Sequence, residues 1–313
     1  MSTVLVETSS YAPQASGAND ALRVDVFVTA PRGTADMGRL LLALRGQLGP
    51  ADRLVILDGT DAAASLDTSA LPGVGTFEHV RGAGESAFHL RRHVTAMTSR
   101  DITVVFEEHA VPGPRFMSEI RRLFADDPAV TAVKLLGRND TSTSPWSWAN
   151  FFVTFAECLH PANDTPKTLL STSAAVRTAA LDSAPRMLGD WEAQVMPGFS
   201  REPRALTYSN DVWIDHVDPC DMRLALVGNF YNQRSLAAMR IAQGHRRGKH
   251  TVRAFKDLAL RRPGQIARAL AGRDEYRYFA ANRWKVVFVC WAAALGAITG
   301  AWFGAGSSMR KMH

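Results

Sequence analysis

The sequence contains few cysteines and none of the glycine-rich loops that bind phosphate. Cys158, Cys220 and Cys290 share no close spacing, which argues against a disulfide framework or a thiolate metal site and favours a reducing, cytosolic setting. No GxGxxG turn follows the first apolar run, and no Walker sequence occurs. If this chain binds a nucleotide, we expect a metal ion rather than a helix N-terminus to neutralise the phosphates.

The first residues also lack the pattern of a secretory leader. The stretch "MSTVLVETSSYAPQASGAND" has neither a basic start nor an apolar centre. We therefore expect residues 1–22 to form a disordered lead.

Positive charge is scarce in most of the chain and concentrated in one late segment. Residues 1–239 contain 21 Lys and Arg against 27 Asp and Glu, whereas residues 240–285 contain 13 against 3. A nucleic-acid-binding protein normally carries its basic face on the folded body. The acidic body therefore argues against a nucleic-acid partner.

A long uncharged run follows the basic segment. Residues 286–306 contain no charged side chain over 21 positions, about enough to cross the ~30 Å hydrocarbon core of a bilayer. Trp284 and Trp302 stand near its ends, where interfacial aromatics are favoured. We expect a transmembrane or membrane-inserted helix. A buried soluble helix or a re-entrant segment is the alternative, because four glycines lower the hydrophobicity of the run.

The charges that flank this run predict its orientation. Four cations precede it and two follow it: Arg273, Arg277, Arg283 and Lys285, then Arg310 and Lys311. By the positive-inside rule, the N-terminal body should lie on the cytoplasmic side of an inner or plasma membrane. Residues 246–285 are then expected to form basic amphipathic helices that bind anionic lipid headgroups, and residues 307–313 a short tail.

Glycines recur within the uncharged run. Gly296, Gly300 and Gly304 are four residues apart, which puts them on one helical face and permits close helix–helix contact. This face can serve a homo-oligomer, a partner protein or the chain's own basic helices.

Between Arg23 and Leu136, short apolar runs alternate with amphipathic ones. The expected strands are 24–30, 53–59, 77–80, 102–108 and 129–136, and the expected helices are 36–48, with Thr34 as N-cap, 86–98 and 115–125. This alternation predicts an α/β fold with a parallel sheet.

The pattern loosens after residue 140. We expect a polar loop at 141–152, a short strand at 169–171, helices at 174–181 and 191–199, a strand at 212–218 and a long amphipathic helix at 222–243.

Acidic residues stand at the ends of two expected strands. Asp58 ends one strand, and Glu107, Glu108 and His109 end another. Ligands of parallel sheets bind beyond the carboxyl ends of the strands, so these residues should share one crevice. Carboxylate oxygens with a tolerated imidazole suit a hard divalent cation. A solvated strand end is the structural alternative.

The order of these segments resembles family 2 of the glycosyltransferases, which have the GT-A fold. The similarity rests on "VDVFVTA", "RLVILDGTD" and "GAGESAFHLRRHVTAMTSRDITVVFEEHAVPGPRF", and it continues to about residue 245. Glu107-Glu108-His109 matches the metal motif of that family and is similar to the Glu-Asp-His form of a membrane-associated subset. The resemblance implies a Rossmann-like mixed sheet over residues 23–245, followed by C-terminal helices.

The resemblance also implies residue roles. Asp58 would bind the base or ribose, and Arg91 the phosphates. Thr29, in place of a family proline, Ala30, Glu107 and Glu108 would also line the donor site. Glu107, His109 and His216 would hold Mn²⁺ or Mg²⁺. "GDWEAQV" stands where the family has its catalytic acid, so Glu192, or else Asp190, would deprotonate the acceptor, with Trp191 against the acceptor.

The implied activity is transfer of a sugar from a nucleotide-diphospho-sugar, with inversion. The Gln-x-x-Arg-Trp motif of processive synthases is missing, which favours transfer of a single sugar to a lipid-linked or saccharide acceptor in the synthesis of cell-envelope polysaccharide or glycolipid. Two alternatives remain: a non-catalytic membrane-associated scaffold with a degenerate metal motif, and a nucleotidyltransferase, whose glycine-rich basic first loop is absent.

Overall fold

A computed structural model describes most of the chain. The described residues are 5–10, 22–32, 34, 37–60, 74–82, 84–140, 144–162, 174–181, 191, 206–217 and 220–308. Two compact units can be distinguished: residues 1–138 with 160–215, and residues 139–159 with 216–313. The long helix after residue 221 belongs to the second unit, and the domain end expected at residue 245 stays a prediction.

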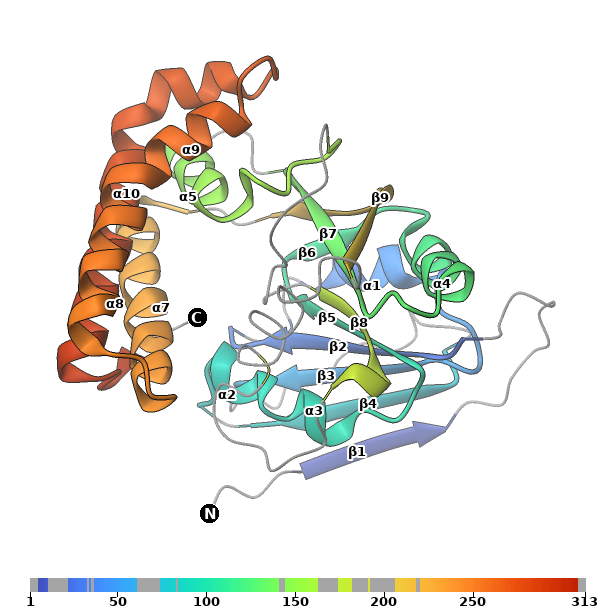
Figure 1. The fold of residues 1–313 in the computed structure, drawn as a ribbon. Helices are drawn as coiled ribbons and strands as arrows, with labels where there is room; N and C mark the ends of the chain where they lie inside the picture. The colour runs from blue at the N-terminus through green and yellow to red at the C-terminus, as the bar shows by residue number, and fades with distance from the viewer. Residues whose placement is uncertain are drawn as a thin grey trace. The chain divides into compact units, whose positions relative to one another are not determined.

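The first unit is built on a mixed sheet (Figure 1). Within the described residues, nine strands follow the order β1-β4-β3-β2-β5-β8-β7-β9-β6. The strands are β1 Leu5–Ser10, β2 Val24–Ala30, β3 Arg53–Asp58, β4 Thr76–Arg81, β5 Ile102–Glu107, β6 Ala110–Pro112, β7 Ala132–Asn139, β8 Ala174–Arg177 and β9 Leu206–His216. Strands β2 to β5 pair in parallel, while β1 and β8 pair antiparallel with β4 and β5.

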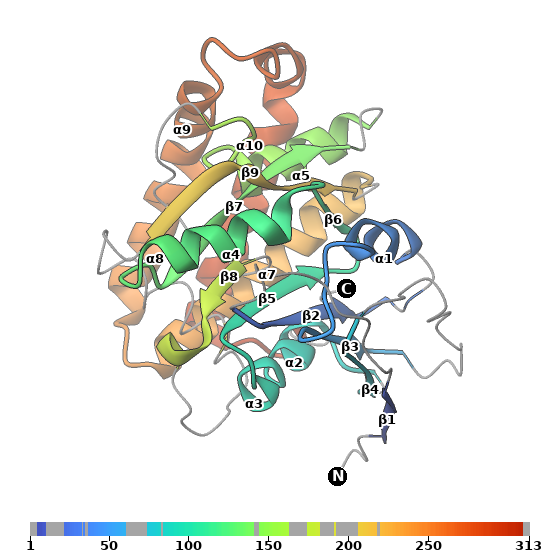
Figure 2. The same cartoon turned by 90° about the vertical axis from the view of Figure 1, so that its right-hand side faces the viewer.

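Helices cover both faces of this sheet. Helices α1 (Gly38–Leu44) and α4 (Phe116–Asp126) lie on one face, and α2 (Ala87–Arg91) and α3 (Val94–Met97) on the other (Figure 2). The central strands are buried on both faces; every residue of β2 is buried. Continuous apolar runs such as "VDVFVTA" are typical of strands covered in this way.

The second unit consists of helices. They are α5 Pro145–Phe155, α7 Met222–Ala242, α8 Arg247–Ala254, η5 Phe255–Arg261, α9 Arg262–Ala269 and α10 Tyr276–Phe303, where η5 is a π-helical segment between α8 and α9. Helix α10 packs on all of the others. It is long and apolar enough to cross a membrane, and half of its most apolar 18-residue window is buried against neighbouring helices.

Four expectations about local structure are wrong. Residues 145–152 of the loop expected at 141–152 belong to helix α5 (Pro145–Phe155), because Ser144 caps the helix and Pro145 starts it. Residues 174–177, expected as helix, form strand β8 between β5 and β7. Part of the expected disordered lead forms β1. Helix α1 starts after Met37, without a side-chain cap from Thr34.

Other expectations fall partly outside the described residues. The strand at 169–171 lies entirely outside them, and only Trp191 of the expected helix at 191–199 is described, in helical conformation. The expected strands at 24–30, 53–59, 77–80, 102–108 and 129–136 and the long helix at 222–243 are confirmed within three residues, whereas the strand expected at 212–218 begins six residues earlier, at Leu206.

Candidate functional site

Two acidic strand ends meet at the carboxyl edge of the parallel sheet. Strand β2 lies between β3 and β5, with Ala30 paired to Asp58 on one side and Thr29 paired to Glu107 on the other. The expected shared edge is therefore confirmed. Thr29 and Ala30 are fully buried, and the Thr29 hydroxyl donates a hydrogen bond to the Phe106 carbonyl at 3.2 Å.

Asp58 is a buried carboxylate with several donors. Its Oδ2 lies 3.1 Å from Nε2 of His79, and its Oδ1 accepts bonds from the Thr60 amide and hydroxyl at 2.9 and 2.8 Å. Burial raises the pKa of Asp58, but the bonds from His79 and Thr60 outweigh it and leave that pKa below its ordinary value. Asp58 is therefore held as an oriented anion.

The glycine after Asp58 is required by close backbone contact. A Cβ atom at Gly59 would overlap the carbonyl oxygen of Glu85 and touch Pro31. The Gly59 carbonyl also accepts a bond from the Gly84 amide at 2.9 Å. The loops that follow β3 and β4 are thus held together beside the Asp58 carboxylate.

The motif at the end of β5 brings His109 close to both of its carboxylates. Glu108 is buried, and its amide donates to the Thr29 carbonyl at 3.1 Å. Nε2 of His109 lies 3.6 Å from Glu107 and its Nδ1 3.7 Å from Glu108. The imidazole therefore stands between two carboxylates.

Arg91 lies against the same motif. It is a buried residue of α2, and its Nη1 is 3.6 Å from Oε1 of Glu107. Its guanidinium also sits 5.2 Å from the ring centroid of Phe88. The structure thus places a buried positive charge at this edge of the sheet, and the phosphate role of Arg91 stays a prediction.

Glu107, His109 and His216 could hold a metal ion. Each offers one ligand atom, and these atoms all lie within 4.8 Å of one another. His216 is the last residue of β9, a strand of the same sheet, and it is buried against the ring of Phe155 at 4.9 Å between centroids. Two imidazoles and a carboxylate fit Mn²⁺ or another divalent ion of intermediate hardness.

A buried atom beside this group supports the fit. Oε2 of Glu108 is buried and has no hydrogen-bond partner within the part of the chain that the structure describes. Leaving a carboxylate oxygen in this condition is costly, and a cation or its bound water would satisfy it.

The acceptor side of the expected site is less accessible. Trp191 is fully buried in a hydrophobic cluster that includes Phe27, Leu57 and Val105. This is the placement of a core side chain, and its acceptor role stays a prediction. Glu192 and Asp190, the two candidate bases, lie outside the described residues.

Comparison with known proteins gives matches among solved structures alone. No family model matches the chain, and no curated protein matches it. The mannosyltransferase PcManGT from Pyrobaculum calidifontis, solved with GDP-Man and Mn²⁺, matches with a TM-score of 0.50 and 16% identity over 94% of this chain and 91% of that chain. The fold is GT-A-like.

Further matches are weaker. Glucosyl-3-phosphoglycerate synthase from Mycobacterium tuberculosis, in complex with phosphoglyceric acid, matches with a TM-score of 0.42 and 16% identity over 64% of this chain and 74% of that chain. The same enzyme with Mn²⁺ and UDP-Glc gives 0.42 and 15% over 66% and 75%. At these identities the likeness concerns the fold.

Sequence reasoning missed one part of this GT-A-like edge. His79 is a buried residue of β4 that contacts Asp58, and buried Glu85 contacts Arg92 at 2.6 Å and His93 at 3.0 Å. Hydrogen bonding to His93, which outweighs burial, lowers the pKa of Glu85. The histidine within the strand next to the one that ends in Asp58 is the sequence feature that could have indicated the His79–Asp58 contact. No spacing in the sequence indicates the contacts of Glu85 with Arg92 and His93.

Proposed function

We propose that this protein is a metal-dependent glycosyltransferase that uses a nucleotide-diphospho-sugar donor. The observation that carries the proposal is the group of Glu107, His109 and His216, which lies at the carboxyl edge of a GT-A-like sheet with Asp58. Ligands of open α/β sheets bind at this edge. One structure of similar fold, PcManGT, was solved with GDP-Man and Mn²⁺.

The chain's own residues would perform the remaining tasks. Asp58, held anionic by its donors, would accept hydrogen bonds from the base or ribose. Arg91, which already pairs with Glu107, would bind the diphosphate. A bound divalent cation supplies charge that offsets the developing negative charge on the leaving nucleoside diphosphate.

The acceptor half of the proposal rests on the sequence. Glu192 would take the proton of the acceptor hydroxyl as it attacks the anomeric carbon, and Asp190 is the alternative base. Transfer of one sugar with inversion, to a lipid-linked or saccharide acceptor at the cytoplasmic face of the membrane, follows from the same comparison of motifs. The product would belong to a cell-envelope polysaccharide or a glycolipid.

One contact favours a second candidate, a non-catalytic scaffold on the same fold. Arg91 lies 3.6 Å from Glu107 and could balance its charge without any metal. A scaffold would keep this ion pair in all its working states, whereas an enzyme would share Glu107 between Arg91 and a cation.

A thermal-shift screen with nucleotide sugars separates the two candidates. We expect one donor to raise the Tm of the wild-type chain with Mn²⁺ and to have little effect with EDTA, because a ligand that binds only the folded state stabilises it. His109→Ala should abolish the metal-dependent part of the shift. The exposed His245→Ala variant is the matched control and should behave as wild type.

Turnover tests the enzymatic half. Glu192→Gln should reduce release of nucleoside diphosphate by 10²-fold or more while leaving the donor-induced Tm shift in place, with Asp190→Asn measured in parallel. If neither donor nor Mn²⁺ changes the Tm of the wild type, the scaffold is the better description.

A further inference from the structure

Helix α10 presents a stripe of large apolar side chains on one side. Trp284, Phe288, Trp291, Leu295 and Trp302 recur at intervals of three, four or seven residues, and each has 48–56% of its surface exposed. This spacing puts them on one face of the helix. An exposed apolar stripe of this size is unusual for a soluble surface and points to an apolar partner.

The opposite face of α10 is already occupied. Cβ atoms at Gly296 and Gly300 would overlap the backbone of Phe230 and Arg234 in α7, so the two helices are in backbone contact. The glycine face predicted from the sequence is therefore filled by the same chain and is not free for a second copy. Gly304 is not part of this face; it ends the helix with a φ of 70°.

Helix α7 is too polar to accompany α10 through a bilayer. Beside Gly300 stands Arg234, whose Nε donates to the Gly304 carbonyl at 2.9 Å. One turn before it, Asn229 donates to the Asn150 side chain at 2.7 Å. Arg234 lies near the C-terminal end of α10, whereas the Asn229–Asn150 pair lies next to Phe230, which packs on Gly296 nearer the middle of the apolar run. A spanning α10 would therefore place these amide groups in hydrocarbon, where polar groups are costly.

The apolar stripe continues from α10 onto the neighbouring helices. Trp291 packs edge-to-face with Phe255 at 6.4 Å between centroids, and the Trp302 indole donates to the Thr251 hydroxyl at 2.9 Å. Val252 and Leu260, on the same α8–η5 segment, are 67% and 59% exposed. The exposed apolar surface thus extends over α8, η5 and α10 and is not confined to one helix.

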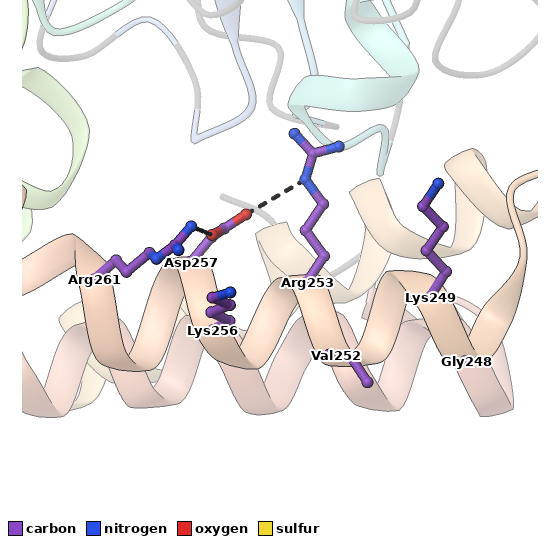
Figure 3. A pocket seen from close by; sticks show the side chains of 7 residues that line it. All are labelled: Gly248, Lys249, Val252, Arg253, Lys256, Asp257 and Arg261. Atoms are coloured by element: carbon purple, nitrogen blue, oxygen red, sulfur yellow. Dashed lines mark hydrogen bonds and ion pairs between the residues drawn. The ribbon is translucent and has the colours of Figure 1, made fainter.

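A basic groove lies alongside this surface. It has a volume of about 500 Å³ and is lined by Gly248, Lys249, Val252, Arg253, Lys256, Asp257 and Arg261 (Figure 3). Asp257 pairs with Arg253 and Arg261 at 3.3 and 3.2 Å, which leaves the lining with three net positive charges. Its apolar member, Val252, also belongs to the exposed apolar surface.

We infer that the helical unit attaches in-plane to one leaflet of an anionic membrane, with α10 lying along the interface instead of crossing the bilayer. The tryptophans enter the headgroup–acyl boundary, where their amphipathic rings are favoured, and the groove binds lipid phosphate. The positive charge of the groove matches an anionic surface. This inference concerns the helices alone and stands whether or not the sheet transfers sugars.

Depth measurement with a lipid-sensitive fluorophore decides between the two geometries. Trp284, Trp291 and Trp302 are each replaced by cysteine in the full chain and labelled, with vesicles of phosphatidylglycerol and phosphatidylcholine as the membrane. The native cysteines are buried and should not label, which the wild type controls. Quenchers at known depths in the lipid then report the position of each label.

In-plane attachment predicts equal, shallow depths for all three labels. Trp284 and Trp302 are about 27 Å apart along the helix axis, so a spanning helix would place Trp291 deep and the other two at opposite interfaces. That profile would overturn the inference. Absence of any vesicle binding by the wild type would overturn it too, and would make α10 a core helix.

Charge and apolar variants test the two parts of the surface separately. Lys249→Gln and Lys256→Gln should each weaken binding to anionic vesicles about fivefold, since a surface lysine contributes about 1 kcal/mol. Trp291→Glu should abolish binding, while Leu42→Glu, at an exposed apolar position in α1, should not change it. Unchanged binding in all the helical variants would contradict the proposed surface.

Discussion

Asp58 illustrates how much a single buried carboxylate depends on its neighbours. It ends β3, and among the described residues His79 and Thr60 supply the hydrogen bonds to its carboxylate oxygens. These hydrogen bonds stabilise the charged carboxylate, so the pKa of Asp58 is lowered despite its burial.

The pH dependence of stability should report this shift. Because the folded-state pKa is lowered, the stabilisation is fully present above the unfolded value of about 3.9 and is lost as pH falls through the folded value. In Asp58→Asn, the free energy of unfolding should therefore fall less steeply below pH 4 than in the wild type. Urea unfolding at a series of pH values measures it, with the exposed Asp126→Asn as control.

If the free energy of unfolding fell equally steeply below pH 4 in the wild type and in Asp58→Asn, Asp58 would not be held anionic in the folded state.

Gly59 has a steric role at the same turn. In Gly59→Ala the new methyl group would overlap the Glu85 carbonyl, so we expect a loss of about 1–3 kcal/mol in the free energy of unfolding. Gly38→Ala is the matched control, since nothing lies within 4 Å of its Cβ position, and it should be neutral or slightly stabilising. Chemical unfolding of both variants measures the difference. A neutral Gly59→Ala would mean that the two loops are not in contact.

The candidate site was predictable where it depends on strand ends. Asp58 and Glu107 follow apolar runs, and parallel strands bring such ends to one edge. The His79 contact depends on β4 lying next to β3 and on which face each side chain takes. The burial of Trp191 depends on tertiary packing, which a lone aromatic residue does not reveal.

At the scale of whole elements, tertiary packing explains why the sequence-based expectations for β8 and α5 were wrong. "AAVR" has a helical composition, yet the sheet places it between β5 and β7, where backbone pairing outweighs propensity. In α5, polar letters around Ser144 suggested a loop, but they cap a helix. The buried Trp148, Phe151, Phe152 and Phe155 then follow at helical intervals.

The contact between α7 and α10 gives a prediction at this scale. Gly296→Leu should force the two helices apart and lower the free energy of unfolding by about 1–3 kcal/mol or more. Gly264→Ala in α9 has open space around its Cβ position and should be neutral or stabilising. Thermal unfolding by circular dichroism compares them. A stable Gly296→Leu would mean that this face of α10 is not packed on α7.

At the scale of the molecule, the two units are interleaved along the chain. Residues 139–159 leave the sheet unit and join the helical unit, to which the chain returns only at residue 216. Within the helical unit, Trp148 of α5 stacks on Tyr278 at 4.4 Å, and Phe152 meets Phe279 of α10 at 6.3 Å.

Truncation should therefore fail at the sheet boundary. A chain that ends at residue 217 retains β9 but leaves the aromatic face of α5 without α7 and α10. Each aromatic side chain that becomes exposed loses about 1.5–3 kcal/mol of burial free energy. We therefore expect the fragment to aggregate, which size-exclusion chromatography would detect. A chain ending at Ser308 is the control and should remain as soluble as the full chain. A monodisperse fragment ending at 217 would show that α5 does not depend on the later helices.

The place of α5 in the chain also has a consequence during synthesis. The ribosome releases α5 well before α7 and α10, and at 5–20 residues per second the delay until Phe279 emerges is several seconds. During that time Trp148 and Phe152 lack their partners from α10, Tyr278 and Phe279. The newborn protein thus passes through an interval in which a chaperone or a lipid surface can capture it, before its own last helix arrives to take that place.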